Sequence, residues 1–149
     1  MSPDVIEVLA ERLLKTGLAR SKRSFTGYTP EEVRQLATDQ GVARFPAVYE
    51  RFLLKMGRRS GRLLAGTECP HPRSGDWREE VDEIMEEYPE VGEFPDDGYV
   101  FASYLSHEFL YFRTSEGDDP PVYHYSGDSE PPEKVADHLS EYLLSLARW

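Results

Sequence analysis

Three short runs of aromatic and β-branched residues in the second half of the chain constrain its fold most strongly. They are residues 99–105 (YVFASYL), 108–113 (EFLYFR) and 121–126 (PVYHYS), and short polar turns such as SEGDDPP separate them. Runs of this composition between turn residues are typical of β-strands. Because connections this short cannot return the chain for parallel pairing, the sequence predicts an antiparallel meander.

The first 57 residues show helical spacing instead. The sequence predicts a first helix with Ser2 as N-cap and Pro3 in its first turn, a buried face that includes Leu9, and an end at Gly17. A basic stretch, residues 19–25, follows as a loop or a short edge strand. Residues 29–41 (TPEEVRQLATDQG) then predict a second helix that opens with a capping box, because its Thr and Glu are three residues apart.

Residues 45–57 (FPAVYERFLLKMG) predict a third, buried helix. Pro46 suits the first helical position, and Gly57 can adopt the left-handed conformation that ends a helix. Its apolar stripe consists of Phe45, Val48, Tyr49, Phe52 and Met56. No side chain on that stripe can perform chemistry, so the helix is expected to serve packing.

Two further elements complete the prediction. Residues 62–66 (RLLAG) predict a short strand, and residues 132–148 predict a closing helix whose buried stripe is Val135, Leu139, Tyr142, Leu143 and Leu146. Helices followed by strands and a final helix indicate an α+β fold with a central, mainly antiparallel sheet. Because 149 residues suit one domain, we expect residues 1–149 to form a single domain.

Composition indicates the cellular compartment of the chain. A lone cysteine, Cys69, excludes an intramolecular disulfide framework, which fits a reducing compartment. The N-terminus carries Asp4 and Glu7 where a signal peptide would need basic and apolar residues. No apolar run approaches the ~18 residues of a membrane span. We therefore expect a soluble, cytoplasmic protein without a membrane partner.

The net charge of −11 is distributed unevenly. Residues 1–75 carry a balance of +5, residues 76–97 a balance of −10, and residues 98–149 a balance of −6. One 22-residue segment thus supplies almost the whole excess of negative charge. An acidic chain would repel nucleic acid, so the charge favours a basic protein as partner instead.

The acidic segment is predicted to begin with a helix at residues 75–88. On that helix Trp77, Val81 and Ile84 share an apolar face, and the carboxylates occupy most of the opposite side. Candidate partner-binding carboxylates are Asp76, Glu79, Glu80, Asp82, Glu83, Glu86, Glu87, Glu90, Asp96 and Asp97. Candidate aromatic anchors at its margin are Tyr88, Tyr99 and Tyr104.

Two interpretations of this acidic ridge stay open. The first is a solvated helix face, which includes pairing with the protein's own basic half, for instance at Arg58. The second is a binding surface. Like charges three or four residues apart destabilise a helix, and a freely varying solvent face would ordinarily intersperse lysine.

No motif in the sequence predicts catalysis or a bound metal. Cys69 and His71 stand two residues apart in a proline-flanked loop, and no second cysteine or paired histidine completes a zinc set. The same loop is a poor setting for a nucleophile and its base. Nucleophile-elbow and phosphate-binding glycine patterns are absent from the sequence. The turn at residues 116–119 (EGDD) is expected to be solvated. We therefore expect no cofactor and no enzymatic activity.

The order of these motifs resembles the SUKH superfamily. The resemblance starts with TPEEV and FPAVYERFLLKMG, and it continues through RLLAGTE, YVFASYLSHEFLYF and PVYHYS to a closing helix of the ADHLSEYLLSLA kind. Its packing signature corresponds here to Phe45, Pro46, Tyr49, Phe52, Leu53 and Gly57. The resemblance implies an α+β fold without shared catalytic residues.

The resemblance also implies two alternative roles. Bacterial members bind and neutralise polymorphic toxins, often nucleases or deaminases, whereas the fungal branch consists of regulatory proteins. The first role predicts an immunity protein whose acidic ridge covers the basic surface of a nucleic-acid-acting toxin domain. The second predicts a regulatory adaptor that acts through protein–protein contacts.

Overall fold

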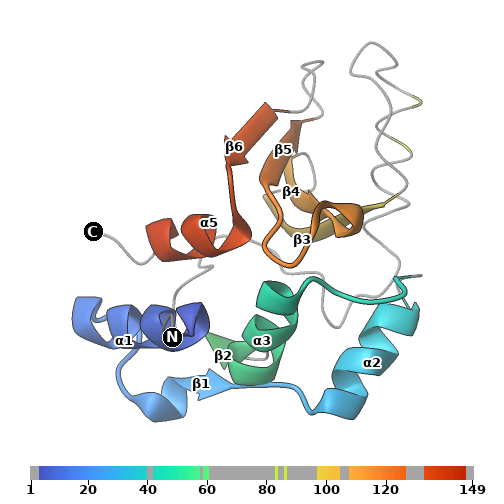
Figure 1. Cartoon of the computed structure of the whole chain (residues 1–149). Coiled ribbons are helices and arrows are strands. Elements are labelled where there is room, and N and C mark those ends of the chain that lie inside the picture. Colours follow the sequence, from blue (N-terminus) through green and yellow to red (C-terminus); the bar gives the residue numbers. More distant parts are fainter. Residues whose placement is uncertain are drawn as a thin grey trace.

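The computed structural model describes residues 4–39, 42–57, 59–60, 83, 86, 97–104, 108–126 and 133–146. Within them an antiparallel sheet lies beside a layer of helices (Figure 1). The helical elements are α1 (Val5–Thr16), η1 (Lys22–Ser24), α2 (Pro30–Asp39), α3 (Ala47–Met56), η3 (Thr114–Glu116) and α5 (Leu139–Leu146). The strands are β1 (Phe25–Thr26), β2 (Arg59–Ser60), β3 (Gly98–Tyr104), β4 (Glu108–Arg113), β5 (Val122–Ser126) and β6 (Glu133–Ala136). The predicted α+β class is confirmed.

The main sheet has the strand order β3-β4-β5-β6, and every neighbouring pair is antiparallel. The predicted meander is therefore confirmed in its three strands. A separate ribbon pairs β1 with β2, so the basic stretch at residues 19–25 ends in a short strand, one of the two forms expected for it. The strand predicted at residues 62–66 lies outside the described residues.

The fourth strand, β6, corrects the prediction of one closing helix from residue 132 to residue 148. In the structure β6 pairs with β5, and α5 begins only at Leu139. The pairing steps from Ala136 to Lys134 against consecutive residues of β5, which leaves Val135 without a partner. Val135 is consequently 45% exposed rather than buried on a helix face. Residues 133–136 therefore form strand hydrogen bonds with β5, and the helical spacing of Val135 from Leu139 does not reflect a helix.

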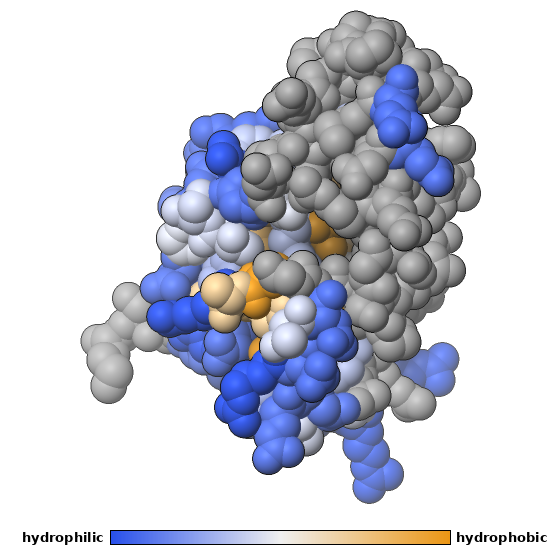
Figure 2. All heavy atoms as spheres, turned by 90° about the vertical axis from the view of Figure 1, so that its right-hand side faces the viewer, coloured by the Kyte–Doolittle hydropathy of each residue, from blue (hydrophilic) through white to orange (hydrophobic). Residues whose placement is uncertain are grey.

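The core lies between α3 and the sheet. The ring of Tyr49 contacts Phe45 at a centroid distance of 5.1 Å, Tyr99 at 5.5 Å and Phe112 at 5.1 Å. Phe101 of β3 meets Tyr142 of α5 at 6.0 Å, which joins the last helix to the same face. The whole predicted stripe of residues 45–56 is buried, so its packing role is confirmed. Among the described residues on the face in Figure 2, hydrophilic ones predominate, and the hydrophobic ones gather near the centre.

The ends of α1 and α2 follow local hydrogen-bonding rules. The backbone N–H of Ile6 donates to the Asp4 side chain at 2.9 Å, so Asp4 is the N-cap of α1 in place of the predicted Ser2. Gly17 ends α1 with a φ of 81°. The capping box of α2 is confirmed, because the backbone N–H groups of Thr29 and Glu32 each donate to the other's side chain, at 3.0 and 3.1 Å.

Gly57 ends α3 for a different reason than predicted. Its φ is −64°, so it remains in the right-handed region, and Pro46 is the N-cap rather than the first helical residue. A Cβ atom on Gly57 would stand 2.7 Å from the carbonyl oxygen of Leu53 and 2.7 Å from the ring of Tyr28. Glycine is required here because the segment that precedes α2 crosses closely over the end of α3.

The turn between β4 and β5 is exposed at Glu116, Gly117 and Asp118, as expected, but it also bonds to two helices. The carbonyl of Asp118 accepts a bond from the N–H of Val48 in α3, at 3.0 Å. The Asp119 carboxylate accepts bonds from the backbone N–H and the hydroxyl of Ser140 in α5, at 2.9 and 2.6 Å. One turn thus satisfies donors at the N-termini of two helices. None of the described helices is long and apolar enough to cross a membrane.

Candidate functional site

Glu83 and Glu86 represent the predicted acidic ridge in the described part of the chain. Both are helical and exposed. They are three residues apart, a spacing that puts two side chains on the same face where a helix is continuous. The other candidate carboxylates before Asp97, together with Tyr88, lie outside the described residues.

Asp97, the last predicted ridge carboxylate, is engaged within the protein. Its side chain accepts a bond from Nε of Arg113 at 2.8 Å and another from the hydroxyl of Ser115. Burial raises its pKa, but the bonds from Ser115 and Arg113 outweigh burial and hold the pKa below 3.8. Its negative charge is therefore balanced where β3 begins and β4 ends, and it adds little to an exposed anionic surface.

The two remaining aromatic candidates lie on β3. Tyr99 is only 4% exposed, and its ring packs against Phe45 at 5.0 Å. The reason is register, since Tyr99 stands opposite Phe112 on the sheet face that α3 covers. Tyr99 is thus a core residue. Tyr104 lies at the far end of β3, opposite Glu108.

A pair of tyrosines on β4 and β5 was not singled out from the sequence. The rings of Tyr111 and Tyr123 stack at 5.2 Å, and the Tyr123 hydroxyl donates to Glu116 at 3.0 Å. Burial, the largest cause, raises the pKa of Tyr111 to about 12. Burial and the bond to Glu116 also raise the pKa of Tyr123. Both phenols stay protonated at neutral pH, so they can donate hydrogen bonds but not act as bases. The available signal was a tyrosine on each of two predicted neighbouring strands.

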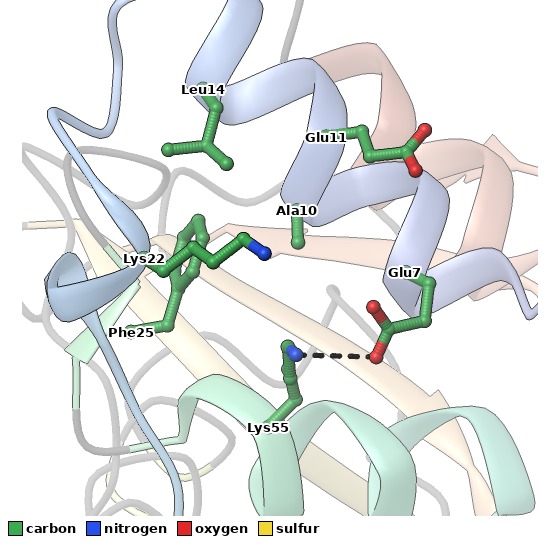
Figure 3. A pocket seen from close by; sticks show the side chains of 7 residues that line it. All are labelled: Glu7, Ala10, Glu11, Leu14, Lys22, Phe25 and Lys55. Carbon is green, nitrogen blue, oxygen red and sulfur yellow. Dashed lines mark ion pairs between the residues drawn. The ribbon is translucent and has the colours of Figure 1, made fainter.

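A hollow between α1 and α3 was also missed by sequence reasoning (Figure 3). Its volume is about 250 Å³. An ion pair between Lys55 and Glu7, at 3.2 Å, closes one side of it. It is lined by Glu7, Ala10, Glu11, Leu14, Lys22, Phe25 and Lys55. These residues come from four elements, so only the tertiary structure could bring them together.

The described residues contain no cluster of three or more His, Cys, Asp and Glu side chains that could hold a metal ion. Cys69 and His71, the pair considered from the sequence, lie outside the described residues. Nδ1 of His138 donates to the carbonyl of Asp119, at 2.9 Å. That bond tethers the start of α5, which is a structural role.

Comparison with known families gives one match. Residues 27–145 match the model of the SMI1 / KNR4 family (SUKH-1). The matched range runs from the segment before α2 through most of α5, so it includes the packing signature of α3 and the whole main sheet. Helix α1 and the segment that carries η1 and β1 precede it. No curated protein matches the chain.

Proposed function

The chain belongs to the SMI1 / KNR4 family (SUKH-1), and from this premise we propose that it is an immunity protein that binds and neutralises a cognate toxin domain. The family consists generally of non-catalytic immunity and regulatory proteins. The proposed activity is therefore inhibition by binding: the protein covers a surface that the toxin needs for its substrate.

The observation that carries the proposal is the acidic segment with its exposed helical carboxylates. Glu83 and Glu86 are each helical and exposed, and they lie within 22 residues that hold a net charge of −10. Such a concentration of one sign attracts an oppositely charged partner over distances of about one Debye length, roughly 8 Å at physiological salt, and speeds association.

The charge also indicates the class of toxin. An enzyme that acts on nucleic acid presents cations to the phosphates of its substrate. Carboxylates spaced along a helix can form ion pairs with those cations in place of the phosphates. We therefore propose a basic, nucleic-acid-acting toxin domain as the partner, with Glu83 and Glu86 in the interface.

The test uses the protein encoded by the gene next to that of this chain. That protein is purified alone and also together with this chain. Its association with the wild type, with Glu83→Lys/Glu86→Lys and with Glu31→Lys/Glu141→Lys is followed by surface plasmon resonance at two salt concentrations. The second variant is a matched control, because Glu31 and Glu141 are also exposed helical carboxylates. We expect the first variant to associate about tenfold more slowly or worse and to lose part of its salt dependence, and the control to stay within about twofold.

Three outcomes decide the proposal. Unchanged binding by the Glu83→Lys/Glu86→Lys variant would remove the acidic segment from the interface. Binding that leaves the partner's toxic activity intact would favour the regulatory adaptor instead. Binding that abolishes the activity, and is weakened only by the first variant, supports the immunity function.

A further inference from the structure

A second charged surface, of opposite sign, lies on α1 and η1. We call it the basic patch; its members are Arg12, Lys15, Arg20, Lys22 and Arg23. All five side chains are exposed. Within the described residues none of them forms an ion pair, although Lys55, Arg51, Arg113 and Lys134 all do. Five neighbouring cations thus remain free to meet an anionic partner.

The backbone beneath the basic patch is held in one conformation. The N–H of Ala19 donates to the carbonyl of Leu13 at 3.0 Å, and Ala19 is only 3% exposed. The hydroxyl of Ser24 accepts bonds from the N–H groups of Arg20 and Ser21, at 3.3 and 3.4 Å. These anchors present the cations on a fixed frame, and a preorganised surface loses less conformational entropy on binding.

The hollow of Figure 3 adjoins the basic patch. The side chain of Lys22 forms one wall and extends its ammonium group into the hollow, while Ala10, Leu14 and Phe25 supply apolar surface (Figure 3). On the opposite side Glu7 is paired with Lys55, and the carboxylate of Glu11 points away from Lys22. The volume of about 250 Å³ is below the roughly 300–1,000 Å³ of drug-sized ligand sites. It suits a single large side chain.

A second, shallower hollow lies along the exposed side of α1. It is lined by Val8, Glu11, Arg12, Leu14 and Lys15, and its volume is about 580 Å³. Leu14 and Glu11 line both hollows, so the two hollows adjoin at these side chains. Together they offer two adjoining, partly apolar hollows that carry the cations Lys22, Arg12 and Lys15 beside the carboxylate of Glu11.

We propose that the basic patch and its hollows bind an acidic polypeptide segment that inserts one bulky hydrophobic side chain beside Lys22. Charge complementarity selects the acidic segment, and the apolar wall of Phe25 and Leu14 selects the hydrophobic side chain. The bases of a single-stranded nucleic acid can stack on Phe25, so charge rather than apolar contact disfavours this occupant. A long polyanion would also meet the rest of a chain whose net charge is −11, whereas a short peptide need not extend beyond the patch.

This surface is independent of the proposed toxin interface. Apart from Lys55 of α3, its residues precede those that match the family, and the charge of the basic patch is opposite to that of the acidic segment. The protein can therefore hold a basic partner on one surface and an acidic partner on another.

The test measures fluorescence anisotropy with a labelled ten-residue peptide of Glu and Asp that contains one central Phe. A second peptide carries Ala in place of Phe, and a labelled oligothymidylate of similar length serves as the nucleic-acid probe. The proteins are the full chain, its Lys22→Glu/Arg23→Glu variant and its Arg34→Glu/Arg44→Glu variant. The last is matched in charge change, because Arg34 and Arg44 are exposed and form no ion pair in the described part of the chain.

We expect the Phe peptide to bind the wild type and to lose about tenfold in affinity for Lys22→Glu/Arg23→Glu, with less than twofold loss for the control. Replacing Phe by Ala should weaken binding by a further factor of about ten, since one buried aromatic side chain is lost. Equal losses in both variants, equal affinity for the two peptides, or tighter binding of oligothymidylate would each overturn the proposal. Circular dichroism of both variants verifies that the fold is retained.

Discussion

Replacing Asp119 by alanine should destabilise the protein, although the residue lies in a turn. Its carboxylate accepts bonds from the backbone N–H and from the hydroxyl of Ser140, at 2.9 and 2.6 Å. The first bond satisfies a donor in the first turn of α5, as a capping residue does, but from a distant part of the chain. Neighbouring carbonyls tether the same turn to α3 and α5 and are unaffected by the substitution.

The magnitude follows from the two bonds that are lost. A capping bond is worth about 1 kcal/mol, and a second hydrogen bond to a partly buried carboxylate contributes a similar amount. We therefore expect Asp119→Ala to lower the free energy of unfolding by about 2 kcal/mol. For a domain of this size, that loss corresponds to a fall in Tm of about 4–8 °C.

Urea denaturation followed by circular dichroism measures the loss, with Asp118→Ala as the control. Asp118 is exposed and is engaged through its carbonyl, which the substitution retains, so we expect a change below about 0.5 kcal/mol. A loss below about 0.5 kcal/mol for Asp119→Ala would refute the reasoning. An equal loss in both variants would also refute the reasoning, because the effect would then come from the change in net charge rather than from the lost bonds with Ser140.

Three further predictions test individual features of the fold. Gly57→Asn should lower the free energy of unfolding by about 1–3 kcal/mol, because the new Cβ would collide with neighbouring atoms. Gly17→Asn should lower it less, since Asn tolerates a positive φ. Urea denaturation compares the two variants. By the same assay, Val135→Thr at the bulge of β6 should stay within about 0.5 kcal/mol, whereas Val122→Thr in the core should cost about 1–3 kcal/mol. The bond to a backbone carbonyl raises the pKa of His138 above the ordinary 6.5. Protonated His138 therefore stabilises the fold below pH 6.5, and this contribution is lost as the pH rises through the raised pKa of the folded state. His138→Gln should abolish that decline in Tm above pH 6.5, and an NMR titration of the ring checks the direction.

The sequence predicted those elements whose signals are local. The capping box at Thr29 and Glu32 depends on two residues three positions apart, and both of its bonds are present. The apolar stripe of α3 was likewise readable from periodicity, and the three strands of the meander were readable from their aromatic and β-branched composition. The composition of the acidic segment was equally plain, and it motivates the proposed function.

Positions that depend on distant partners were not predictable in this way. Tyr99 was expected at a binding surface, but pairing with Phe112 turns it toward α3. Val135 matched a helical stripe, and only its strand partner shows that it lies on a bulge. The hollow beside Lys22 combines residues of α1, η1, β1 and α3, and no sequence spacing relates them.

The sequence by itself thus determined the α+β class, the buried faces of α1 and α3 and the segregation of charge into a basic half and an acidic segment. Hydrophobic period, capping residues and composition act within one or two turns, so they can be read along the chain. Only the tertiary structure decided that the 116–121 turn binds two helices, that Gly57 is needed for close approach, and that the basic patch borders an apolar hollow. Each of these depends on atoms that are far apart in sequence and meet only when the elements pack.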